Sequence, residues 1–304
     1  MRKKSTKGTS SFTDRWAAQG LLFVLPAVFF VGLFIVIPIF MNLFLAFTNY
    51  RGFGNPYRFI GLQNFRSIFT DPSFWLVFTN TFKLLLIYVV ALNVVAVFLA
   101  VLIADMGAGF GTFIKSLLYF PCLLAQVVVG FVWRMILNYQ RGLVNLTFRG
   151  LGLDFLALNW LGEMQLVIPV ISLVIVWFAT GYYTIIYYAG LMAISPDYYE
   201  VATLEGANGW QKFRFVTLPL LAPAITINVV LSTMGVLGAY DLPTSLSSGG
   251  GPGYHGTTFA ILVIRYVYET YQMGKALSVA VVMAFIAIIL GYIELKLLVR
   301  REVH

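Results

Sequence analysis

The chain has 304 residues, of which 60% are hydrophobic and 11% are charged. Soluble domains carry about 25% charged residues, so this composition excludes an ordinary soluble domain and indicates an integral membrane protein. The apolar runs are continuous, which excludes a membrane β-barrel, whose strands alternate in polarity over about ten residues. Basic loops beside anionic lipid account for the net charge of +8, so no nucleic-acid partner is needed. We therefore expect an all-α polytopic membrane protein.

The first expected span covers residues 20–48. Gly20 to Tyr50 contains no charged residue, and about 20 apolar residues are enough to cross the hydrocarbon core. Pro26 and Pro38 lie inside this run, so we expect kinks where a backbone hydrogen bond is lost. The run is too long for the apolar region of a secretory signal, which predicts a retained helix. Five further spans are expected, at about 78–104, 114–138, 165–194, 217–240 and 276–299.

Basic residues set the expected orientation of these spans. Residues 1–19 form a basic tail with five Lys or Arg, and positive residues stay on the cytoplasmic side of a membrane. Six crossings then return the short tail of residues 301–304 to the cytoplasm. Residues 20–300 are expected to form a single membrane domain, because no stretch between the spans is long enough for a separate soluble domain.

Residues 195–217 interrupt the apolar pattern with five charged residues. Ser195-Pro196 is a favourable helix start, since Ser caps the free amides and Pro is tolerated at the first helical position. The stretch from Gly206 to Gly209 supplies the conformational freedom of a tight turn. Each Asp, Lys or Arg at the bilayer centre would cost about 2.5–3.5 kcal/mol. The segment is therefore expected at the cytoplasmic face, as a helix–turn–helix.

This segment carries a family resemblance. EVATLEGANGWQKFRFVTLPLL is similar to the EAA loop of ABC-importer membrane subunits, whose pattern is Glu-Ala-Ala, then Asp-Gly-Ala, and later Leu-Pro. Val201 and Glu205 depart from it conservatively. The stretches LLFVLPAVFFVGLFIVIPIFMNLFLAFTNY, FIGLQNF, SSGGGPG and VYETYQMGKALSVAVVM resemble the carbohydrate (MalF-like) branch of binding-protein-dependent transport system inner membrane components. The chain has neither the extra N-terminal helices nor the large periplasmic insert of the MalF type, so it resembles the compact six-helix members.

The resemblance implies a type I ABC importer permease in a bacterial or archaeal plasma membrane. Its implied partners are a second permease subunit, two cytoplasmic ATPase subunits, an extracytoplasmic solute-binding protein and a sugar. The chain has no Gly-x4-Gly-Lys-Ser/Thr motif, so ATP and Mg are expected on the partner ATPase and the chain itself is not expected to be an enzyme. The coupling residues that the resemblance implies are Glu200, Ala202, Glu205, Gly206, Ala207, Phe213 and Pro219.

The fourth and fifth spans are the expected substrate path, because these two helices line the sugar site in the subunits that the chain resembles. Sugars are held by aromatic faces and uncharged hydrogen-bonding groups, and polar residues inside a membrane are the first candidates for such a site. A second interpretation stays open, in which the aromatic rings only pack between helices and the serine bonds its own helix. The candidate substrate residues are Tyr182, Ser232, Phe178, Asn228 and Tyr240.

Other classes of site, substrate and transporter fit the sequence less well. A single cysteine, Cys122, excludes an internal disulfide, and two histidines do not make a convincing metal site. Arg134 and Lys83 leave a polyol phosphate or another small polar solute as an alternative substrate, although snorkelling at helix ends explains both side chains. An ion-coupled secondary carrier would keep ionisable residues at mid-membrane, whereas Asp105, Asp241 and Glu294 lie near span ends.

Overall fold

The computed structural model describes residues 23–52 and 54–301. Within these residues every regular element is a helix, and the one β-contact is an isolated bridge between Thr48 and Phe59. Four helices are long and apolar enough to cross a membrane, and two bent helix pairs raise the number to six if each pair is one span. The four continuous helices are Phe23–Leu45, which ends in α2 (Ile37–Leu45), α4 (Pro72–Ala104), α8 (Val167–Met192) and α15 (Met273–Leu298).

Helix α4 begins at Pro72, six residues before the expected start of its span. Asp71 caps it, because the Asp71 carboxylate accepts a 2.9 Å hydrogen bond from the Ser73 amide. Pro72 then occupies the first helical position, where the missing N–H has no cost. A cap and a proline therefore set this boundary, while the apolar run alone marks only where the hydrophobic part begins.

The third apolar run is broken. It consists of α5 (Ala108–Tyr119), a 3-10 turn η2 (Phe120–Leu123) and α6 (Gln126–Ile136), and the chain turns by 96° between Gly109–Leu123 and Gln126–Ile136. Pro121 lies in the 3-10 turn, and Leu124 and Ala125 have extended backbone angles. The stretch expected as one span at 114–138 is therefore two helices that meet at a sharp corner.

A second break separates the segment at 195–217 from the helix that follows. Residues Gly209–Leu220 are helical throughout, with a π-helical turn η4 (Phe213–Thr217), and they meet α12 (Ala222–Leu237) at an angle of 67°. Prolines flank the corner, at Pro219 and Pro223. Because proline lacks an N–H and crowds the carbonyl four residues earlier, two of them in adjacent turns favour a break at this point.

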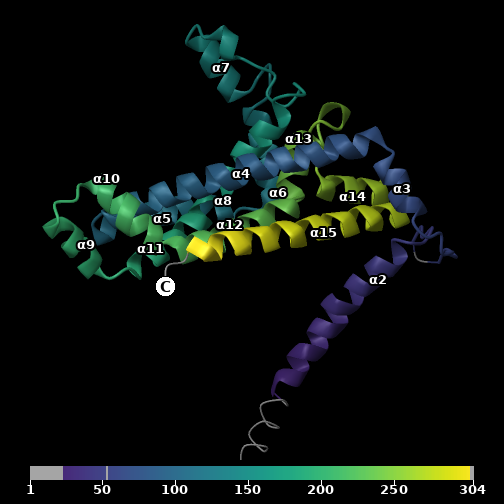
Figure 1. Cartoon of the computed structure of the whole chain (residues 1–304). Helices are drawn as coiled ribbons and strands as arrows, with labels where there is room; N and C mark the ends of the chain where they lie inside the picture. The colour runs from purple at the N-terminus through teal and green to yellow at the C-terminus, as the bar shows by residue number, and fades with distance from the viewer. Residues whose placement is uncertain (1–22, 53, 302–304) are drawn as a thin grey trace, which may run out of the picture.

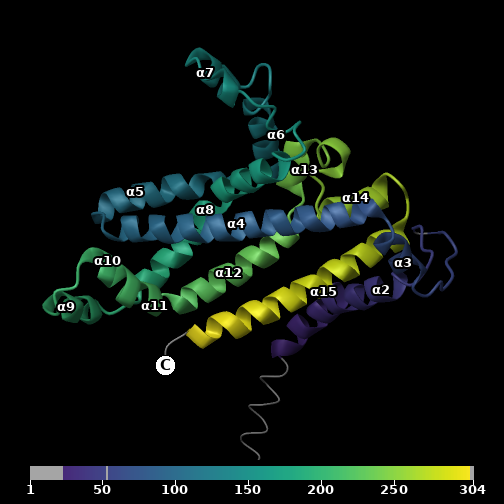
Figure 2. The same ribbon diagram turned by 45° about the horizontal axis from the view of Figure 1, so that its top comes forward.

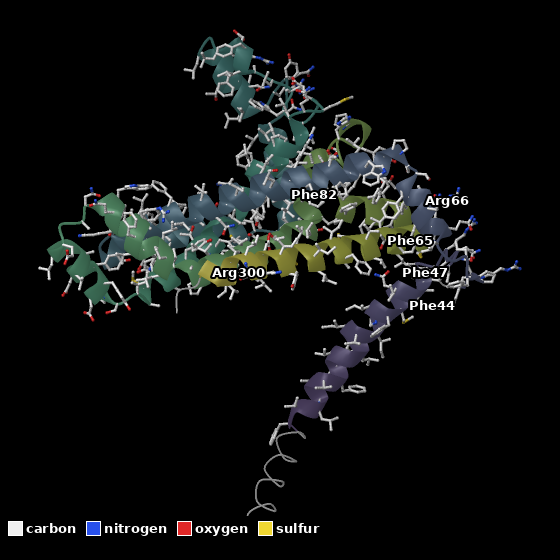
Figure 3. All side chains as sticks on the ribbon, in the orientation of Figure 1. Phe44, Phe47, Phe65, Arg66, Phe82 and Arg300 are labelled. Atoms are coloured by element: carbon white, nitrogen blue, oxygen red, sulfur yellow. The ribbon has the colours of Figure 1, made fainter. Side chains whose placement is uncertain are left out.

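Helices α4, α8 and α12 form the centre of the bundle, with α15 alongside α12 (Figures 1 and 2). Buried side chains of α4 and α8, among them Leu92, Ile171 and Tyr187, make most of the core. The first helix is different: none of its membrane-length window is buried, and Figure 3 shows its side chains standing clear of the bundle. Its contact with the rest of the chain is at its Leu45 end.

The short elements gather at the two ends of the bundle (Figure 1). Helices α9 and α10 lie at the end where α15 finishes, whereas α3, α13 and α14 lie toward the opposite end. Helix α7 stands away from the bundle beyond α6. Their bounds are α3 (Gln63–Phe69), α7 (Leu143–Gly150), α9 (Pro196–Leu204), α10 (Gly209–Lys212), α11 (Leu218–Leu220), α13 (Asp241–Ser247) and α14 (Phe259–Tyr268), with short turns η1 (Gly32–Val36), η3 (Asp154–Leu156), η5 (Pro252–Tyr254) and η6 (Val299–Arg301).

Candidate substrate cavity and coupling segment

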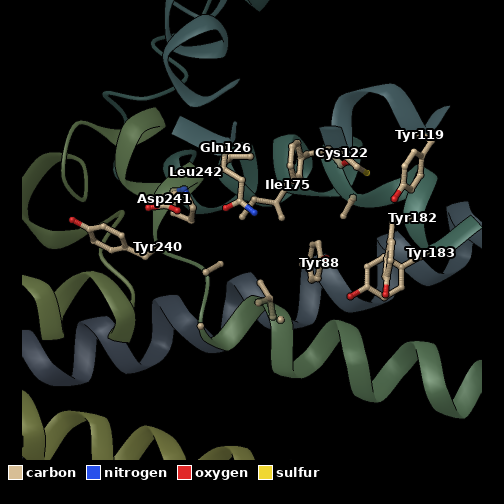
Figure 4. Close-up of a pocket in the computed structure, with 17 residues that line it drawn as sticks. Tyr88, Tyr119, Cys122, Gln126, Ile175, Tyr182, Tyr183, Tyr240, Asp241 and Leu242 are labelled. Atoms are coloured by element: carbon tan, nitrogen blue, oxygen red, sulfur yellow. The ribbon is translucent and has the colours of Figure 1, made fainter. Parts of the chain in front are cut away.

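A cavity of about 410 Å³ opens where α5, α6, α8 and α12 meet, close to the corner of the broken third span. Six of its 17 lining residues are aromatic, and the wall also carries one amide, one thiol and one carboxylate (Figure 4). The polar and aromatic residues that line it are Tyr88, Tyr119, Cys122, Gln126, Phe178, Tyr182, Tyr183, Tyr240 and Asp241.

Three of the five candidate substrate residues lie at this cavity: Phe178, Tyr182 and Tyr240. Tyr182 is 45% exposed, while Phe178 is buried in the wall. The ring of Tyr182 stands nearly perpendicular to that of Tyr183, with centroids 5.2 Å apart. The arrangement offers aromatic faces together with hydroxyl groups that can donate or accept hydrogen bonds.

Ser232 does not line the cavity. Its hydroxyl donates to the backbone carbonyl of Val229 at 2.9 Å and accepts from the Asn93 amide at 3.2 Å. The Tyr187 hydroxyl donates to the Asn93 side-chain oxygen at 2.5 Å. Val236, one turn further along α12, does line the cavity. Ser232 instead belongs to a hydrogen-bonded layer that joins α4, α8 and α12.

Asn228 lies one turn deeper still and is fully buried. Its amide nitrogen makes a long 3.4 Å hydrogen bond to the Tyr183 carbonyl, and its side-chain oxygen has no partner among the described residues. The structure therefore brings neither Asn228 nor Ser232 together with Tyr182. Both lie between the cavity and the helix end that leads to α10 and α11.

Close helix contacts hold the cavity wall in place. A Cβ added to Gly181 of α8 would overlap the backbone of Leu118 and lie 2.7 Å from the Tyr119 Cα. A Cβ on Gly130 of α6 would overlap the Ser245 hydroxyl of α13. Since only glycine permits these approaches, Gly181 holds α5 against α8 and Gly130 holds α13 against α6. The two contacts hold α5 against α8 and α6 against α13 beside the cavity.

Residues 195–217, called the EAA segment from here on, form the expected helix–turn–helix. Helix α9 starts at Pro196 behind the Ser195 cap. It ends at Leu204, and Gly206, two residues later, has a φ of +80°. The Ala207 amide donates to the Ala202 carbonyl at 2.9 Å, and the Gly206 amide donates to the Thr203 carbonyl at 3.0 Å. This pair of bonds is a Schellman motif, which requires a left-handed residue and so favours glycine at position 206.

The second arm of the EAA segment has its own start signal. The Asn208 side chain accepts from the Gln211 amide at 2.9 Å, and the Gln211 side chain accepts from the Asn208 amide at 2.8 Å, which is a capping box. A 3.1 Å hydrogen bond between the hydroxyls of Tyr199 and Thr217 then joins the two arms. The segment is therefore a defined structure.

The seven expected coupling residues all lie in this segment or just after it. Glu200, Glu205 and Gly206 are exposed, whereas the other four are partly buried. Helix α9 also carries an exposed apolar side, on which Leu204 is 88% exposed beside Tyr198 and Val201. The partly buried members are Ala202, Ala207, Phe213 and Pro219.

The family model for binding-protein-dependent transport system inner membrane components matches residues 12–302. The chain belongs to this family. It is 31% identical over 279 residues to a probable ABC transporter permease protein of Pyrococcus horikoshii, covering 90% of this chain and 94% of the relative. It is 27% identical to the lactose transport system permease protein of Rhizobium radiobacter, with 94% of each chain covered. The permease is therefore a multi-pass membrane protein, and the relatives named here are transport subunits.

The fold of the permease also matches a solved structure. A chain of a bacterial alginate ABC transporter, determined in complex with an alginate pentasaccharide-bound periplasmic protein, has a TM-score of 0.81. The match covers 96% of this chain and 97% of the other, at 22% identity. The chain thus has the fold of an ABC importer permease.

Sequence reasoning missed several lining residues of the permease cavity. Gln126 could have been found, because it is the one amide in the third apolar run. Its place on the cavity wall, however, depends on the 96° corner beside it. Asp241 follows the candidate Tyr240 directly, and both lie on the wall because α12 ends at Leu237. Among the described residues no group of three His, Cys, Asp or Glu side chains could hold a metal ion.

Proposed function

We propose that this chain is a membrane-spanning permease subunit of an ATP-driven, binding-protein-dependent sugar importer. The observation that carries the proposal is the cavity, which combines aromatic faces, phenol hydroxyls and an amide in a chain of this transporter family. Aromatic faces pack on the C–H surface of a sugar while hydroxyl and amide groups bond its hydroxyls. Phe178, Tyr182 and Tyr240 are the sequence candidates that make this wall.

Relatives support the sugar class. The relative from Rhizobium radiobacter is named for lactose, and the matching solved structure belongs to a transporter of a polysaccharide. Both names describe saccharides of at least two units. We therefore propose a sugar or oligosaccharide as the substrate of this chain.

The EAA segment is proposed to couple this chain to a separate ATPase. The exposed apolar side of α9 and the exposed carboxylates of Glu200 and Glu205 suit a groove with an apolar floor and a cationic rim. ATP and Mg bind to that partner, since the chain lacks a phosphate-binding loop motif. The proposed complex also holds a second permease subunit, two ATPase copies and an extracytoplasmic solute-binding protein.

The proposed orientation has both termini and the EAA segment in the cytoplasm of a bacterial or archaeal cell. It rests on the basic N-terminal tail and on the even number of spans that the family fold implies. The cavity then lies toward the opposite side, between the outer end of the bundle and the layer that contains Ser232 and Asn93.

The test is sugar uptake by cells that contain the complete transporter. Removal of Tyr182 in the variant Tyr182→Ala is expected to raise KM about tenfold, because an aromatic contact contributes about 1 kcal/mol or more. Tyr188→Ala is the matched control, since Tyr188 lies on the same helix away from the cavity, below the Lys115 ammonium. Uptake should persist with an ionophore and stop when ATP is depleted.

Two results would count against the proposal. Equal kinetics for Tyr182→Ala and the unchanged protein would remove the cavity from the sugar path. Uptake that collapses with the ionophore while ATP is intact would indicate an ion-coupled carrier. Co-purification on a tagged copy of this chain, followed by mass spectrometry, identifies the second permease and the ATPase.

A further inference from the structure

The cavity wall carries a single formal charge. Asp241 supplies it, and the remaining lining residues are phenols, one amide, one thiol and apolar groups. Asp241 is exposed, and its carboxylate forms no ion pair with any residue that the structure describes. A solute in the cavity therefore meets one negative group.

The cations of α5 and α6, two of the helices that meet at the cavity, are engaged elsewhere. The Arg134 guanidinium donates to the Ser248 hydroxyl at 2.8 Å and lies 4.7 Å from the centre of the Phe131 ring. It lines a different cleft of about 420 Å³. Lys115 places its ammonium 4.1 Å above the Tyr188 ring. No Lys or Arg of the described residues lines the cavity, so nothing there neutralises Asp241.

The partial charges at helix ends do not reverse the negative sign of the charge at the cavity. Two helices begin at the wall, α6 at Gln126 and α13 at Asp241, and each contributes about half a positive charge. Two helices end there, α5 at Tyr119 and α12 at Leu237, and each contributes about half a negative charge. These partial charges offset each other. The full charge of the Asp241 carboxylate remains, in a site with low-dielectric apolar walls that strengthen its field.

We propose that Asp241 makes the cavity selective for uncharged saccharides. Its oxygens accept hydrogen bonds from sugar hydroxyls, because a carboxylate is an acceptor without donors. The same charge repels the carboxylate of a sugar acid and the phosphate of a polyol phosphate. The inference rests on the proposed function, since it takes this cavity as the sugar site, and it narrows the substrate class to neutral sugars.

Cys122 provides a direct probe of this field. It is the only cysteine of the chain, and it lines the same cavity as Asp241. The transporter is purified through a tag on this chain, and Cys122 is modified with methanethiosulfonates of matched size that carry a positive charge, no charge or a negative charge. The ratio of the cationic to the anionic rate is divided by the same ratio for a small free thiol in solution. This normalised ratio reports the electrostatic potential at Cys122, because the reactivities of the thiol and of the two reagents cancel.

The expected ratio is about fivefold or more in favour of the cation, and it should fall toward one in Asp241→Asn. Asp154→Asn is the matched control, because Asp154 is an exposed carboxylate of η3 outside the cavity, and its ratio should equal that of the unchanged protein. A normalised ratio of one in the unchanged protein, or the same ratio in Asp241→Asn, would overturn the inference.

A second measurement separates this inference from the proposed function. Neutral maltose is expected to slow the modification of Cys122 by the uncharged reagent, whereas glucose 6-phosphate at the same concentration is not. Protection by both solutes contradicts the charge selectivity and leaves the sugar site standing. If neither solute protects Cys122, and other neutral disaccharides tried in turn do not protect it either, the result contradicts the sugar site and with it the inference.

Discussion

Gly206 shows how a family pattern follows from backbone geometry. Its φ of +80° places it in the left-handed region, and the two bonds of the Schellman motif run across it from Ala207 and Gly206 to α9. A residue with a Cβ pays about 1–2 kcal/mol in this conformation. The small residues of the EAA pattern therefore end one helix and allow the next to start after Asn208.

Gly206→Ala is expected to loosen the end of α9. The Ala207 amide, which closes the motif, should exchange its hydrogen about tenfold faster, because a cost of about 1.4 kcal/mol is a factor of ten in an equilibrium. Gly209→Ala is the matched control: Gly209 opens α10, and at both positions an added Cβ meets no atom within 4 Å. Identical exchange at Ala207 in the two variants would contradict the geometric account.

At the residue scale the sequence predicted the types of side chain at the cavity better than the level of each residue along its helix. Tyr182 and Phe178 were expected to share a substrate site, and both line the cavity. Ser232 was expected at the same site, yet one turn of about 5.4 Å separates it from Val236, which lines the wall. Helical periodicity gives the face of a residue. It does not give the level along the axis at which a neighbouring helix ends or bends.

Helices α5 and α8 depend on Gly181 for their close approach. Gly181→Ala is expected to force α5 outward and to lower the melting temperature of the purified protein by about 5 °C, the range of a 1–3 kcal/mol overpacking penalty. Gly235→Ala is the matched control at the same cavity, because its Cβ would meet only the Tyr183 hydroxyl at 3.7 Å, an ordinary contact. Equal melting temperatures for the two variants would show that α5 adjusts without strain.

At the element scale the sequence marks where helices break but not by how much they turn. Pro121, Pro219 and Pro223 are visible in the sequence, and each removes a backbone donor. The resulting angles of 96° and 67° depend on packing against α8 and α4. The sequence alone does not show this packing. For this reason the third and fifth runs were expected as simple spans.

The whole molecule is expected to keep α7 and the EAA segment on opposite sides of the membrane. In a Cys122→Ala background, a cysteine at exposed Gln140, which precedes α7, should react with a membrane-impermeant maleimide on intact cells. A cysteine at exposed Glu205 should react only after the cells are permeabilised. The reverse pattern would invert the orientation derived from the basic tail, and labelling of both sites on intact cells would rule out an intervening bilayer.

The 67° corner at Leu221 makes the fifth segment a lever with its fulcrum between two prolines. Its short arm, Gly209–Leu220, is about 18 Å long and its long arm, the 16 residues of α12, is about 24 Å long. A turn of about 10° at the fulcrum would carry the far end of α12 through about 4 Å, by the rise of 1.5 Å per residue. That end holds Val236 and leads directly into Tyr240 and Asp241. A small tilt of the short arm would thus be enlarged into a displacement of about 4 Å, which is enough to make or break a hydrogen bond to a sugar hydroxyl.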